Sequence, residues 1–115
     1  LTIDALRDFG ADTASGLARC LNNEAFYFRL IKMALDDGSF DKLHAALDAG
    51  DKQAAFEAAH ALKGVLGNLS LTPLFEPASE LTELLRAGTE ADYALYLAEI
   101  DTQKERLRAL IAEEE

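Results

Sequence analysis

Four residues of one segment could do chemistry by their types and their spacing: His60, Lys63, Gly64 and Gly67. At about 100° per residue, positions i, i+3, i+4 and i+7 gather in one sector of a helix. That sector lies about 150° from the apolar one, so we expect the imidazole of His60 to point to solvent. An exposed imidazole is a nucleophile, and a lysine one turn away can neutralise part of the charge of a phosphoryl group. The pattern therefore predicts that His60 accepts a phosphoryl group.

The two glycines lie inside the expected helix rather than at its ends. Glycine in a helix interior costs about 1 kcal/mol relative to alanine, so something on this face requires it. We interpret Gly64 and Gly67 as positions without side chains that let another molecule approach His60. Close packing against a neighbouring helix is the alternative, and the position of both glycines opposite the apolar stripe disfavours it.

Three other residues were candidates for a role in function or packing. Phe56 lies one turn before His60 on nearly the same face, where it either packs against a neighbouring helix or belongs to an exposed docking patch. His44 adjoins apolar residues at helical spacing, and we interpret it as structural. Cys20 is expected to be a small core residue. Two histidines and one cysteine do not have metal-ligand spacing, and no glycine-rich phosphate loop is present, so we expect neither a metal site nor nucleotide binding.

The helix that must carry the site runs from a cap at Asp51 to Leu69. Its apolar residues recur at helical spacing and form the stripe that faces the core: Ala55, Ala58, Ala59, Leu62, Val65, Leu66 and Leu69. Gly50 ends the preceding helix directly before the cap, so these two helices should form a tight antiparallel pair.

The remaining segments also have the caps, glycines and prolines that bound helices. Before the site helix we expect a short helix over 2–10, a second through Leu21 capped by Asp12 or Thr13, a third over 24–37 ended by Gly38, and a fourth capped by Ser39 or Asp41. After it we expect a helix with Thr72 as cap and Pro73 first, and a last helix opened by residues 89–92. The third helix should bury Phe26, Tyr27, Leu30, Ile31, Ala34 and Leu35, and the last should bury Tyr93, Tyr96, Leu97, Ile100, Leu107, Leu110 and Ile111. Residues 113–115 should form a solvated end.

Composition favours an all-helical protein. Half of the 115 residues are hydrophobic, only two are proline, and alanine, leucine and glutamate are common. This length suits a single domain over 1–115. We expect an antiparallel up-down four-helix bundle with one or two short extra N-terminal helices.

Charge, apolar runs and cysteine content bear on the partners and the location of the protein. The net charge of −10, from 21 acidic and 11 basic residues, would repel nucleic acid. No run approaches the roughly 20 apolar residues of a membrane span, so we expect no membrane insertion. A single cysteine suits a reducing compartment, and we expect a cytoplasmic protein. The first residue is Leu1 rather than Met, so we expect a trimmed chain or an excised domain.

The run from His60 to Gly64, followed by Gly67, Asn68 and Leu69, resembles the H-x-L-K-G signature of histidine-containing phosphotransfer (HPt) domains. These four-helix modules relay phosphoryl groups between the aspartates of receiver domains in two-component signalling. The resemblance implies that His60 is phosphorylated at Nε2 and that Lys63 helps to hold the phosphate. It implies receiver domains and a hybrid histidine kinase as partners, no cofactor except Mg²⁺ in the receiver, a monomer, and a carrier rather than an autonomous enzyme.

Two other functions fit an acidic helical bundle. One is an interaction module that binds a partner through the Phe56, Gly64 and Gly67 face without phosphorylation. The other is the phosphotransfer and dimerisation bundle of a histidine kinase, in which an acidic residue usually follows the histidine. Here Ala61 follows, which argues against the kinase bundle.

Overall fold

A computed structural model describes residues 1–113 of the chain. Its helices are α1 (Ile3–Phe9), α2 (Thr13–Arg19), α3 (Glu24–Leu35), α4 (Ser39–Asp48), α5 (Lys52–Asn68), α6 (Thr72–Ala87) and α7 (Tyr93–Ala112). The described part of the chain contains no strand. The predicted all-α class is therefore confirmed.

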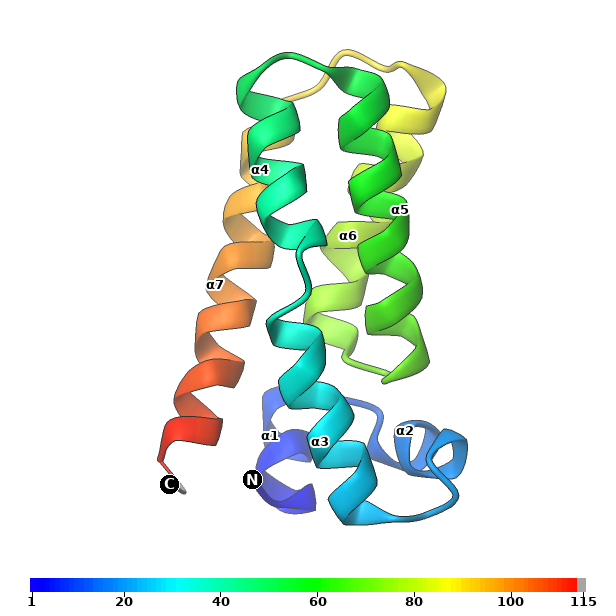
Figure 1. The fold of residues 1–115 in the computed structure, drawn as a ribbon, viewed down its shortest axis with the longest axis vertical. Coiled ribbons are helices and arrows are strands. Elements are labelled where there is room, and N and C mark those ends of the chain that lie inside the picture. The colour runs from blue at the N-terminus through cyan, green and yellow to red at the C-terminus, as the bar shows by residue number, and fades with distance from the viewer. Residues whose placement is uncertain (114–115) are drawn as a thin grey trace.

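The helices form four antiparallel rods along the long axis of the molecule (Figure 1). One rod consists of α3 and α4, which follow each other end to end, and α5, α6 and α7 supply the other three (Figure 1). Helix α5 packs against both α4 and α6, and α6 packs against α7. The two short helices α1 and α2 lie at the end of the bundle where α3 begins (Figure 1). The predicted up-down bundle with short N-terminal helices is confirmed, with one rod broken into two helices.

Side-chain caps begin four of the helices. The side chains of Thr2, Asp12, Asn23 and Asp51 each accept a hydrogen bond from a backbone N–H three residues later. Such a cap satisfies one of the N–H groups that a helix start leaves unpaired. The predicted cap at Asp51 is confirmed, and it sets where α5, the helix that carries His60, begins.

The ends of α2 and α3 differ from the prediction. Helix α2 ends at Arg19 rather than at Leu21, because Leu21 and Asn22 have φ values of 58° and 57°, which a right-handed helix does not allow. Helix α3 ends at Leu35, two residues earlier than predicted. Gly38 does not end α3. Its φ is −63°, and it is the N-cap residue of α4.

The starts of α4, α6 and α7 were also predicted inexactly. Neither Ser39 nor Asp41 caps α4, because the carboxylate of Asp37 accepts the backbone N–H of Ser39 instead. Helix α6 includes Thr72, so Pro73 is its second residue. Helix α7 begins only at Tyr93, after Gly88 has ended α6 with a positive φ of 66°.

The core lies between the rods and follows the predicted stripes, with differences on α5, α3 and α7. On α5 the predicted stripe is buried apart from Val65, which is partly exposed. On α3, Phe26 is 37 % exposed although it was expected to be buried. On α7 only Ile100 and Leu107 are fully buried, while the other predicted apolar residues pack at the edge of the core. Cys20 is buried, as predicted.

Tyr27 joins the N-terminal helices to the end of the site helix. Its buried hydroxyl donates a hydrogen bond of 2.8 Å to the carbonyl of Leu69, the residue directly after α5. Burial raises the pKa of Tyr27 to about 12, because the charged phenolate would lose its hydration. Gly16 makes room for this ring: a Cβ there would lie 2.3 Å from the Tyr27 hydroxyl oxygen. This contact holds α2 and α3 against the end of α5.

Residues 114–115 lie outside the described part of the chain, so the predicted solvated end is described only at Glu113.

Candidate functional site

His60 lies on the exposed face of α5, as its position on the helical wheel predicted. Its ring stacks on that of Phe56, with centroids 5.7 Å apart and an angle of 16° between the planes. The two residues are one turn apart, and side chains at this spacing lie on the same face of a helix. The stacking restricts the orientation of the imidazole while leaving the ring open to solvent.

Two residues of α6 extend this stack and connect it to Lys63. The guanidinium of Arg86 lies over the Phe56 ring, 5.1 Å from its centroid. Arg86 Nε is 3.4 Å from a carboxylate oxygen of Glu83, and the other carboxylate oxygen is 3.4 Å from Lys63 Nζ. A chain of contacts therefore runs from His60 through Phe56, Arg86 and Glu83 to Lys63.

These contacts bear on the two interpretations of Phe56, which are packing against a neighbouring helix and a place in a docking patch. The ring is partly buried and packs against the core, so it is a boundary residue between α5 and α6. It also stacks on the imidazole, in agreement with the predicted position of both residues on nearly the same face. A role of Phe56 in docking remains a prediction.

The two glycines have different surroundings. A Cβ at Gly64 would meet no atom within 4 Å, so this position opens directly to solvent. A Cβ at Gly67 would lie 3.0 Å and 3.2 Å from two ring carbons of Phe75 on α6, closer than side chains normally pack. Close helix packing therefore accounts for Gly67, whereas the open space at Gly64 fits the predicted clearance around His60, which stays a prediction. The sequence misjudged Gly67 because the wheel of one helix does not show which neighbour covers its edge.

A shallow depression of about 380 Å³ adjoins the histidine. Its lining residues are Arg19, His60, Lys63, Gly64, Gly67, Asn68 and Phe75. Arg19 comes from α2 and its Nη1 donates a hydrogen bond of 2.7 Å to the Gly67 carbonyl. Nothing in the sequence indicated Arg19, because 48 residues separate these partners and only the packing of α2 beneath α5 brings them together.

His44 makes its contact elsewhere, with Asp101 on α7. One of its ring nitrogens lies 2.9 Å from a carboxylate oxygen of Asp101, so the pair joins α4 to α7. Both side chains are 43 % exposed. The contact supports the structural interpretation of His44.

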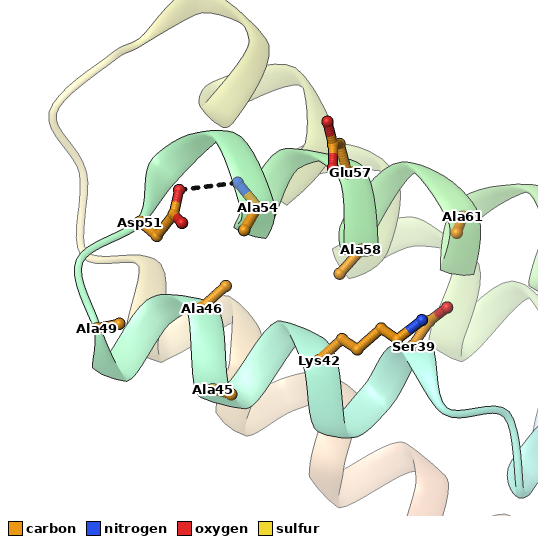
Figure 2. Close-up of a pocket in the computed structure, with 10 residues that line it drawn as sticks. All are labelled: Ser39, Lys42, Ala45, Ala46, Ala49, Asp51, Ala54, Glu57, Ala58 and Ala61. Carbon is orange, nitrogen blue, oxygen red and sulfur yellow. Dashed lines mark hydrogen bonds between the residues drawn. The ribbon is translucent and has the colours of Figure 1, made fainter.

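A larger groove of about 490 Å³ lies between α4 and α5 on another face (Figure 2). Six alanines line it, and Asp51, at one end, uses a carboxylate oxygen to cap α5 (Figure 2). The groove contains no histidine or cysteine. It therefore offers no nucleophile comparable with His60.

Two further features bear on the classes of function. Among residues 1–113, no three histidine, cysteine or acidic side chains lie close enough together to hold a metal ion. Over the same residues, none of the helices combines the length and apolar character that crossing a membrane requires.

Comparison with known proteins gave one match. The family model of the Hpt domain matches residues 29–113, from within α3 to the end of α7. The matched part contains His60 and all the α5 and α6 residues of the site, but not Arg19. Searches of curated proteins and of solved structures gave no significant match.

Proposed function

The chain belongs to the histidine-containing phosphotransfer family, and from this premise we propose that His60 carries phosphoryl groups between receiver-domain aspartates in a two-component phosphorelay. One observation above all supports this proposal. His60 is exposed, and the space beside it at Gly64 is empty, so a partner can bring its own reactive group to the imidazole. Members of this family transfer phosphoryl groups through a histidine, and His60 occupies that position in the signature.

The reaction is a displacement at phosphorus. A lone pair on one nitrogen of the neutral imidazole, Nε2 by resemblance to the family, attacks the phosphorus of an aspartyl phosphate. The N–P bond forms as the bond between phosphorus and the carboxylate oxygen breaks, and the electron pair of that bond leaves with the carboxylate. The reverse sequence passes the group from His60 to the aspartate of a second receiver.

Phe56 and Lys63 would assist at different moments. Phe56 holds the imidazole in one orientation before the reaction, which lowers the cost of aligning nitrogen and phosphorus. Lys63 begins next to Glu83, at 3.4 Å, and would turn to the phosphoryl group once that group is on His60. A phosphoryl group carries more charge than one carboxylate, so it should compete well for the ammonium of Lys63.

The domain would act as a carrier rather than as an enzyme. It needs no cofactor of its own under this proposal, because the receiver brings the Mg²⁺ ion that stabilises charge on the transferring group. Its partners would be receiver domains and a hybrid histidine kinase. A cytoplasmic location and a monomeric state remain predictions.

Transfer of labelled phosphate tests the proposal. A panel of phosphorylated receiver domains is mixed with this protein or with its His60→Gln variant, and the label is then followed through acid and alkali treatment. We expect label that requires His60, is lost in acid and is retained in alkali. A folded protein that takes no label from any receiver would contradict the proposal. Binding that survives in His60→Gln without transfer would favour the interaction module instead.

A further inference from the structure

Arg19 enters the site from outside the part of the chain that defines the family. It is the last residue of α2, and the family match begins only at residue 29. Its guanidinium nevertheless lines the same depression as His60, Lys63 and Gly64. Arg19 therefore reaches the site from outside the matched region.

One hydrogen bond anchors the guanidinium of Arg19, and its other donors remain available. One nitrogen, Nη1, donates to the Gly67 carbonyl near the C-terminal end of α5, where the helix dipole favours positive charge. A guanidinium has five N–H donors, so most of its hydrogen-bonding capacity remains available. Arg19 is exposed, and within residues 1–113 no carboxylate forms an ion pair with it.

The charge around the depression differs from that of the whole chain. The protein has a net charge of −10, yet the depression is lined by two cations and by no carboxylate. Lys63 already has Glu83 as a partner. Of the two cations that line the depression, Arg19 can therefore pair with a carboxylate of another molecule without first breaking an existing ion pair.

Arg19 is anchored at Gly67, about two helical turns beyond His60. Gly67 lies seven residues beyond His60, which corresponds to about 10 Å along the helix axis. Side chains on a helix also lean towards its N-terminus, which carries the imidazole further from Gly67. A cation at this distance from the reacting atoms can touch the rim of a docked partner.

We propose that Arg19 is a docking residue that pairs with carboxylates at the rim of the receiver domain's phosphorylation site. The inference rests on the proposed function, because the partner it names is the one that delivers phosphate to His60. A receiver that holds Mg²⁺ beside its aspartate has a carboxylate-rich pocket, which complements the positive depression. Charges at the rim of an interface act mainly on the rate of encounter and on its salt dependence.

The experiment compares Arg19→Gln, Arg19→Lys and a control, Arg7→Gln, which removes one exposed positive charge from α1. Glutamine at position 19 removes the charge and keeps an amide group, whereas lysine keeps the charge without the guanidinium. Phosphate transfer from a phosphorylated receiver is measured against receiver concentration at two salt concentrations. A second measurement uses phosphoramidate, a small donor that reaches His60 without docking.

We expect Arg19→Gln to raise the receiver concentration that gives half the maximal transfer rate about tenfold at low salt, to change the maximal rate little, and to weaken the salt dependence. Arg19→Lys should recover most of the loss, Arg7→Gln should behave like the wild type, and phosphoramidate should label all four proteins equally. An equal half-saturating receiver concentration and an equal salt dependence in the wild type and Arg19→Gln would overturn the inference alone. A wild type that accepts phosphate from no receiver would contradict the proposed function, and with it this inference.

Discussion

The ring of Phe75 lies against Gly67, so that a Cβ at this position would be 3.0 Å from the nearest ring carbon. Helices α5 and α6 therefore approach closely beside the site, and the ring of Phe75 forms one wall of the depression that adjoins His60. One turn earlier in α5, Gly64 faces open space. Gly67 thus contributes to packing, whereas Gly64 leaves open space in the same depression.

Leucine substitutions should separate these two contributions. Gly64→Leu should leave the free energy of unfolding unchanged or raise it by up to about 1 kcal/mol, because glycine is a poor helix former. The same variant should lose phosphate transfer from receivers. Gly67→Leu should lower the free energy of unfolding by about 1–3 kcal/mol, because the larger side chain must displace Phe75. Urea denaturation and transfer of labelled phosphate check both; normal transfer in folded Gly64→Leu would contradict the clearance argument.

Phe56→Leu should slow phosphorylation of His60 from any donor. Aromatic stacking of this kind contributes about 0.5–1.5 kcal/mol, so loss of the ring should reduce the rate several-fold by releasing the imidazole. The rates from phosphoramidate and from a receiver distinguish positioning from docking. A decrease with the receiver alone would show that Phe56 acts in docking and does not orient His60.

Glu83→Gln should prolong the life of the phosphorylated protein. The variant frees Lys63 from its carboxylate partner and removes a negative charge from the neighbourhood of the phosphoryl group. Exposed ion pairs contribute up to about 1 kcal/mol, so we expect a two- to fivefold longer half-life of phosphohistidine. The matched control is Glu80→Gln, an exposed carboxylate on the same helix. Equal half-lives in Glu83→Gln and the wild type would show that Lys63 does not act on the phosphate.

Tyr27→Phe should destabilise the end of the bundle that carries the site. The variant leaves the buried Leu69 carbonyl without its donor, which costs about 1–3 kcal/mol of unfolding free energy. Tyr96→Phe, on α7, is the control for loss of a hydroxyl at the edge of the core. Urea denaturation followed by circular dichroism measures both. Equal midpoints for Tyr27→Phe and Tyr96→Phe would contradict the importance of this hydrogen bond.

The same tyrosine predicts a pH dependence. The pKa of Tyr27 is raised to about 12 in the folded protein from an ordinary value of 10.0, so the folded state holds the phenol proton more tightly. The stabilisation is fully present below pH 10 and is lost as pH rises towards 12. The difference in unfolding free energy between the wild type and Tyr27→Phe should therefore shrink over this range. A constant difference between pH 9 and pH 12 would show that the hydroxyl does not titrate in this way.

The sequence by itself determined the features that depend on neighbours within one helix. His60, Lys63 and Gly64 had to share a face because helical geometry fixes residues three and four apart. The cap at Asp51 fixed where that helix begins, and its apolar stripe fixed which side is buried. The all-helical class followed from composition and from the spacing of apolar residues in every segment.

The tertiary structure decided which residues of other helices complete the site. Glu83, Arg86 and Phe75 lie on α6, and Arg19 lies on α2. Their meeting with α5 depends on the rotation and the longitudinal offset of each helix against its neighbour. A periodic stripe states only that a helix has a buried side, and many pairings of stripes satisfy that condition. Only specific contacts between helices select one pairing. Examples are the ring of Phe75 against Gly67 and the hydrogen bond from Tyr27 to the Leu69 carbonyl.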